Sequence, residues 1–87
     1  MNRTDALCKA FGWQGGTIHQ IAEKTGCTAE DLLYTPDKPN EGLSTNYSKG
    51  WFAGRTCTIE HNLRVNFPNF SGNLDFWIGV AEGIRMG

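Results

Sequence analysis

The segment from residue 18 to residue 34 limits the fold more than any other part of this chain. Its sequence, IHQIAEKTGCTAEDLLY, has the spacing of a helix-turn-helix. Ala22 is small enough to let two helices approach closely, and Gly26 suits the tight turn between them. The segment therefore predicts two packed helices, at 18–24 and 29–34. Their inner face is formed by Ile18, Ile21, Leu32 and Leu33.

The charge of this segment disfavours the usual role of a helix-turn-helix, which is to read DNA. The second helix would enter the major groove, where Arg, Lys, Asn and Gln match the edges of bases. It carries Glu30 and Asp31 and neither Lys nor Arg. Because carboxylates repel phosphates, we expect these two residues to lie on a solvated face or to contact a basic partner.

The composition excludes several classes of protein. The chain has 87 residues, with eight Lys and Arg against nine Asp and Glu. This length predicts a single domain, and the balanced charge offers no basic surface for phosphate backbones. No apolar run approaches the roughly 20 residues of a membrane-spanning helix, and the first residues lack the apolar core of a signal peptide. We therefore expect a cytoplasmic protein.

Helix signals extend the prediction to the first residues. A helix is expected over residues 3–11, with Asn2 or Thr4 as its cap and Gly12 as its stop. Thr28 is a suitable cap for the third helix. The first part of the chain therefore reads as three helices.

Two prolines within residues 35–43 predict a loop, since they remove backbone donors and restrict the residues before them. The loop divides the single domain into a helical part, 1–35, and an aromatic part, 44–87. The aromatic part is expected to hold two further helices, at 45–54 and 74–85. The predicted fold class is thus mainly α.

Residues 56–67 are ambiguous. Apolar and polar residues alternate there, which is the pattern of a half-buried β-strand. A strand needs a partner, and the chain has no second run of equal quality. The segment at 46–53 could be extended and pair with it, a second subunit could pair with it, or the alternation could be accidental.

The predicted helix at 74–85 is apolar almost all round. Such a helix is either buried or forms half of an interface. Gly79 and Gly83 are one turn apart and would allow another backbone to approach closely. Because this helix and the possible strand both lack an obvious partner, a homodimer is one expectation.

Three pieces of the aromatic part resemble the ribosome modulation factor family. They are YSKGWFAGR at 47–55, NFPNF at 66–70 and FWIGVAEG at 76–83. The resemblance implies two helices rich in glycine and aromatic residues, joined by a linker with a Pro-aromatic element. It also implies a small bacterial or phage protein that binds ribosomes. The aromatic residues of these pieces could equally be the core of the domain.

Metal binding and catalysis find little support in the sequence. The candidate ligands are Cys8, Cys27, Cys57, His19 and His61, and no tight Cys-x-x-Cys pair is present. The odd number of cysteines also argues against a disulfide scaffold. No phosphate-binding glycine loop occurs. We therefore expect no metal, no cofactor and no enzymatic activity.

The remaining expectation is a small regulatory protein, plausibly encoded by a phage or prophage, that binds a host protein or complex. Trp, Tyr, Phe and Arg are favoured as anchors at such interfaces. The candidate partner-binding residues are Glu30, Asp31, Tyr47, Trp51, Phe52, Arg55 and Trp77. The alternative is nucleic-acid binding, which would require one basic face built from Lys24, Lys49, Arg55, Arg64 and Arg85.

Overall fold

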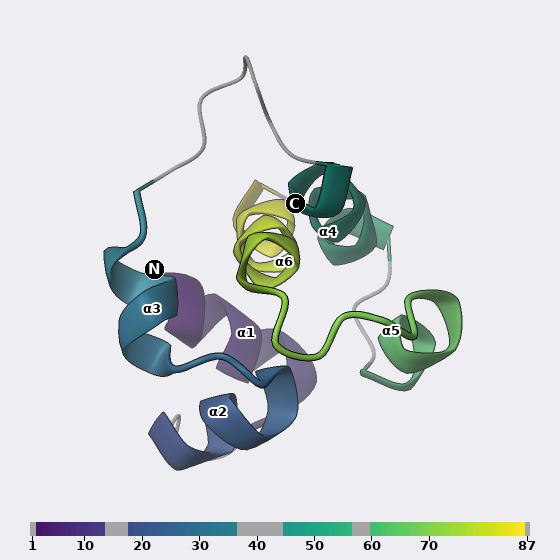
Figure 1. The fold of residues 1–87 in the computed structure, drawn as a ribbon. Helices are drawn as coiled ribbons and strands as arrows, with labels where there is room; N and C mark the ends of the chain where they lie inside the picture. Colours follow the sequence, from purple (N-terminus) through teal and green to yellow (C-terminus); the bar gives the residue numbers. More distant parts are fainter. Residues whose placement is uncertain (1, 14–17, 37–44, 57–59, 87) are drawn as a thin grey trace.

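The computed structural model describes residues 2–13, 18–36, 45–56 and 60–86. These residues form helices and connecting turns, which confirms the mainly α prediction. Figure 1 shows α6 near the centre, with α4 on one side and α1 and α3 on the other. The elements are α1 (Arg3–Phe11), α2 (Ile18–Thr25), α3 (Ala29–Tyr34), α4 (Thr45–Thr56), α5 (Glu60–Asn66) and α6 (Leu74–Met86).

Short polar side chains begin several of these helices. The side chain of Asn2 accepts a hydrogen bond from the Asp5 amide and caps α1. Thr28 caps α3 in the same way, as predicted, and Asn73 accepts from an amide in the first turn of α6. Gly12 ends α1 in the left-handed conformation, with φ of 70°. These local signals explain why the boundaries of α1 and α3 could be predicted closely.

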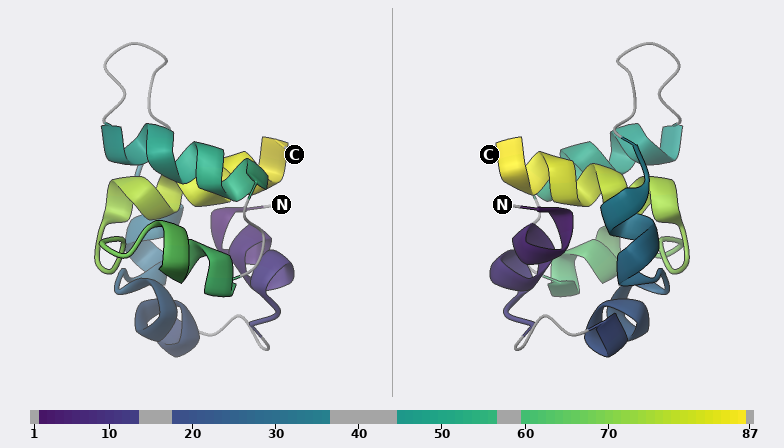
Figure 2. Two further views of the ribbon diagram at one scale, coloured as in Figure 1. Left: turned by 90° about the vertical axis from the view of Figure 1, so that its right-hand side faces the viewer. Right: turned by 90° about the vertical axis from the view of Figure 1, so that its left-hand side faces the viewer.

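Glycines bring α4 and α6 into direct backbone contact. A Cβ atom on Gly50 would lie 2.0 Å from the carbonyl oxygen of Phe76, and one on Gly54 would lie 2.2 Å from that of Val80. In the other direction, a Cβ on Gly79 would lie 2.3 Å from the carbonyl oxygen of Tyr47. Gly83 meets the next turn of α4 in the same way. The two helices therefore run parallel and side by side, and only glycine fits at their contact (Figure 2).

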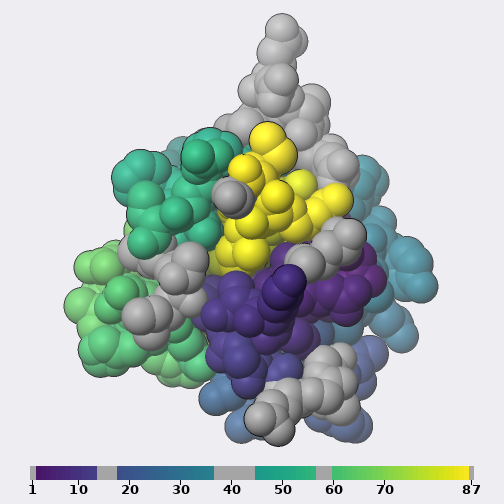
Figure 3. Space-filling model, turned by 180° about the vertical axis from the view of Figure 1, so that it is seen from behind, coloured from purple at the N-terminus to yellow at the C-terminus, as the bar shows by residue number. Residues whose placement is uncertain are grey.

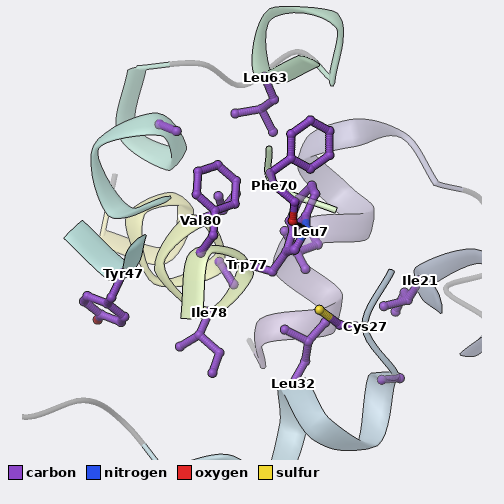
Figure 4. Packing of buried hydrophobic residues seen from close by; sticks show 14 of the residues in the cluster. Leu7, Ile21, Cys27, Leu32, Tyr47, Leu63, Phe70, Trp77, Ile78 and Val80 are labelled. Atoms are coloured by element: carbon purple, nitrogen blue, oxygen red, sulfur yellow. Dashed lines mark hydrogen bonds between the residues drawn. The ribbon is translucent and has the colours of Figure 1, made fainter. Parts of the chain in front are cut away.

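Aromatic side chains join the first helix to the last, and Figure 3 shows the surface of α1 directly against that of α6. The rings of Phe11 and Trp77 lie 6.4 Å apart edge to face, and those of Trp13 and Trp77 lie 6.2 Å apart. On the other side of Trp77, the Phe70 ring lies at 5.3 Å. The indole N–H of Trp77 donates to the backbone oxygen of Phe70 at 3.1 Å, so its one polar atom is satisfied within the core. Figure 4 shows Trp77 and Leu7 within this cluster.

The β-strand that was one possibility for 56–67 does not form over the described part of this segment. Residues 60–66 form helix α5, while 57–59 lie outside the described residues. Helical spacing places Leu63 in the core, where it is fully buried, and leaves Val65 exposed. A salt bridge between Glu60 and Arg64, one turn apart and 2.8 Å between nitrogen and oxygen, is a helical contact. The alternation in the sequence was accidental.

The segment at 18–34 forms α2 and α3, with Gly26 between them at φ of 74°. Ile21 and Leu32 are fully buried as expected, but Ile18 and Leu33 are exposed, at 44% and 38%, so the predicted inner face was only partly right. A Cβ on Gly26 would lie 2.5 Å from the Gly72 amide nitrogen, so this turn also packs against the loop before α6. Ala22 is only half-buried, and its carbonyl accepts the Gly26 amide that closes α2. The predicted proline loop falls largely on 37–44, outside the described residues. In the part of the chain that the structure describes, no helix is long and apolar enough to cross a membrane.

Candidate functional site

The part of α4 that borders its contact with α6 carries the best candidate for a binding surface. Trp51 and Arg55 are one turn apart, and the Arg55 guanidinium carbon lies 5.1 Å above the centre of the Trp51 ring. This distance is typical of a cation–π contact. Phe52 is the next residue and is 61% exposed. We call these three residues, Trp51, Phe52 and Arg55, the α4 surface.

The backbone beneath the α4 surface is held in place. Gly50 and Gly54 flank Trp51 and Phe52 in sequence, and both glycines lie against the backbone of α6. Ala53 is fully buried on the same inner side. The helix therefore cannot rotate without breaking these contacts, so the exposed side chains project from a fixed support. A fixed support lowers the ordering cost of binding.

Two of the predicted partner-binding residues lie in the core. Trp77 is 1% exposed and Tyr47 is 9% exposed, and Figure 4 shows both among the buried residues. Neither side chain offers a partner an accessible face in this conformation. The structure thus separates the aromatic residues of the two helices into a buried group and an exposed group.

The acidic candidates lie on a different element. Glu30 and Asp31 are exposed in the first turn of α3, where carboxylates favour the positive end of the helix. The last residue of α3, Tyr34, is 80% exposed. Figure 1 shows α3 and α4 on different sides of α6, so these residues do not join the α4 surface.

The five basic residues that a nucleic-acid site would require are scattered. Lys24 and Arg64 both reach Glu60, at 3.8 Å and 2.8 Å. Arg85 pairs with Glu82 at 2.7 Å, and Arg55 covers Trp51. Only Lys49 has neither a carboxylate nor an aromatic ring as a partner among the described residues. The described structure therefore holds no continuous basic face made by these five residues.

Thiols and imidazoles do not gather into a metal site within the described ranges, since no group of three or more candidate ligands occurs there. Cys8 and Cys27 are free thiols, and Cys57 lies outside those ranges. Burial raises the pKa of the Cys27 thiol; a hydrogen bond with Thr25 opposes this effect, and the charge of Asp31 adds to it. Burial, with the charge of Asp5, also raises the pKa of Cys8. Raised pKa values make both thiols poor nucleophiles.

Sequence reasoning missed several residues that the structure places at the surface. Tyr34 is the last residue of α3 and is 80% exposed. Met86 is the last residue of α6 and is 65% exposed. Asparagines at four positions, together with Lys49, surround a hollow beside α4. They lie at positions 46, 66, 69 and 73, and the repeated Asn-Phe pair at 66–67 and 69–70 was the signal that could have pointed to it.

Comparison with known proteins gives no relative. No family model matches this chain, and no curated protein or solved structure matches it either. Its function therefore has to be inferred from its own residues and geometry.

Proposed function

We propose that this chain is a small non-enzymatic regulatory protein that binds a larger host protein or complex through the α4 surface. The observation that carries the proposal is the stacked pair of Trp51 and Arg55 on a helix that also exposes the side chain of Phe52. Trp and Arg are the residue types that most often dominate the energy of protein interfaces.

Burial and charge both support a protein as the partner. A single exposed apolar residue needs no explanation, but here an exposed Phe and a half-buried Trp are adjacent on one helix. Three of the five basic side chains that could attract nucleic acid, Lys24, Arg64 and Arg85, are paired with carboxylates of the same chain. The long-range attraction that nucleic-acid binding depends on is therefore weak.

The test is capture of a partner from a bacterial lysate on the immobilised chain, with the captured proteins identified by mass spectrometry. Phe52→Ala and Arg55→Ala should keep the wild-type melting temperature and lose the captured protein. Val65→Ala is the matched control, since Val65 is equally exposed but lies on α5. Capture of the same protein at wild-type yield by Phe52→Ala would refute the proposal.

Nucleic-acid binding is the second candidate, because α4 and α6 are the two aromatic-glycine helices of the resemblance to ribosome modulation factors. Gel shifts with RNA and DNA across a salt series test it. A steep loss of affinity with salt supports this candidate, and absence of binding at low salt removes it.

The homodimer that the sequence suggested loses its two motivations. The presumed strand is mostly helix α5, and α6 has partners in α4 and α1 of the same chain. A monomeric mass by light scattering at high protein concentration would exclude it.

A further inference from the structure

A hollow of about 280 Å³ lies where the loop after α5 meets the first turns of α4 and α6. It is lined by residues of all three pieces that resemble the ribosome modulation factor family. It is separate from the α4 surface, since none of Trp51, Phe52 and Arg55 lines it. Its volume is near the lower end of the range of about 300–1,000 Å³ for small-molecule sites. The hollow therefore suits a group about as large as one amino-acid residue.

Three phenyl rings form the apolar part of the hollow. The ring of Phe76 lies 5.6 Å from that of Phe67 and 6.0 Å from that of Phe70, measured between centroids. Phe70 and Phe76 are buried and Phe67 is half-buried. Phe70 and Phe76 are thus packed within the core, and the half-buried ring of Phe67 is the one that a further aromatic side chain can reach.

The polar part of the hollow supplies donors. Lys49 and Asn46 lie on the first turns of α4, and Asn69 lies in the loop. None of the hydrogen bonds or ion pairs found among the described residues involves these three side chains. Asn73 contributes less, because its side-chain oxygen already accepts the Phe76 amide at 3.2 Å. No Asp or Glu occurs among the described lining residues.

Apolar rings beside an ammonium and two amides fit a ligand that has an apolar side chain and a carboxylate close together. Charged hydrogen bonds from lysine and amide groups are the usual way to hold a carboxylate. An internal acidic residue of a peptide does not meet this need as well, because the side chains of neighbouring residues in an extended chain point in opposite directions. In a C-terminal residue, the side chain and the carboxylate share one Cα atom.

We propose that this hollow binds the C-terminal residue of a partner protein, with an aromatic side chain against the ring of Phe67 and the terminal carboxylate on Lys49, Asn46 and Asn69. The inference deepens the proposed function and rests on it, since it takes the partner to be a protein. It adds the chemical feature by which that partner is recognised.

The test uses two peptides, acetyl-Gly-Gly-Phe with a free C-terminus and the same peptide amidated, titrated into the labelled protein and followed by NMR chemical shifts. The free acid should shift the signals of Asn46, Asn69 and Phe67, and the amide should bind about tenfold more weakly or worse. Lys49→Gln should weaken binding of the free acid to the level of the amide. Lys9→Gln, an exposed lysine on α1, should leave it unchanged.

Equal binding of the two peptides would overturn the proposal, as would shifts that avoid the hollow or no binding by the free acid at millimolar concentration. Adenosine monophosphate is the competing probe, because a nucleotide also joins a flat ring to an anion. Tighter binding of this nucleotide at the same signals would overturn the peptide assignment. The peptides bind without the α4 surface. A negative result in the peptide titration therefore does not change the result of the Phe52→Ala capture experiment, and a negative capture experiment does not change the result of the titration.

Discussion

Arg3 at the start of α1 is joined to Glu82 of α6, with 3.1 Å between Nε and a carboxylate oxygen. The same guanidinium donates to the backbone oxygens of Leu32 and Thr35 at the end of α3. The Arg3 side chain is only 6% exposed. One buried cation thus ties α1, α3 and α6 together, and two backbone carbonyls at the end of α3 accept hydrogen bonds from it.

Replacing Arg3 should therefore destabilise the fold strongly. Arg3→Met keeps the length of the side chain but removes the donor to two backbone carbonyls and one of the two arginines that pair with Glu82, at a cost of about 3 kcal/mol. Urea denaturation measures this loss. Arg85→Met is the control, since Arg85 meets the same carboxylate from the surface and should cost less than about 1 kcal/mol. Similar losses of stability in Arg3→Met and Arg85→Met would contradict the structural role given to the buried Arg3 side chain.

Adding one methyl group between α4 and α6 should also be costly. In an isolated helix, Gly→Ala is favourable by about 1 kcal/mol. In Gly54→Ala the new Cβ would lie 2.2 Å from the Val80 oxygen, so the helices must separate. We expect a net destabilisation of about 2 kcal/mol. Ser48→Ala, on the exposed side of the same helix, should be neutral within about 0.5 kcal/mol; a stabilised Gly54→Ala would refute the close contact.

Glu60 should make the stability depend on pH. Burial alone would raise the pKa of this carboxyl, but hydrogen bonds from Arg64 and Trp13 and the charge of Lys24 outweigh it, so the pKa is lowered. A lowered pKa in the folded state means that the stabilisation is present above the unfolded value of about 4.3 and is lost as pH falls through the folded value. Urea denaturation of wild type and Glu60→Gln should give curves that converge in acid. A gap that stays constant below pH 4 would contradict the lowered pKa.

The buried and exposed tryptophans should respond differently to the same substitution. Trp77→Phe removes the N–H that bonds to Phe70 and leaves a space in the core, which should cost about 2 kcal/mol. Trp51→Phe should cost less than about 1 kcal/mol, because its side chain is partly at the surface. Thermal denaturation of the two variants checks this. A larger loss of stability for Trp51→Phe than for Trp77→Phe would contradict the position of Trp77 in the core.

Local signals in the sequence predicted the helices well and the long-range contacts poorly. Asn2, Thr28 and Gly12 act on their own neighbours, so the boundaries of α1 and α3 followed from a few residues. Gly79 and Gly83 indicated that a backbone would approach α6, and this was confirmed. The spacing of the glycines could not show that α4 is the helix that approaches α6. Gly50 and Gly54 have the same spacing, but this pattern does not specify which helix packs against which.

The binding residues were harder to predict for the same reason. Trp51 and Trp77 look alike in sequence, each beside another aromatic residue and near glycines. Only the packing of α6 against both α1 and α4 buries Trp77 and leaves the α4 surface open. The ambiguity of residues 56–67 has a related cause. Over a short run, alternation of apolar and polar residues does not distinguish a strand from a helix, and only the tertiary contacts that bury Leu63 decide between them.

The parallel direction of α4 and α6 also bears on how the chain folds. Two parallel helices cannot be joined by a tight turn, so the chain must return along the length of α4 through α5 before the glycines meet. The contact between Tyr47 and Gly79 closes a loop of about 30 residues, which costs conformational entropy before any packing is gained. Such non-local contacts slow folding. The packing of α4 therefore depends on a contact that the chain can make only after this loop has closed.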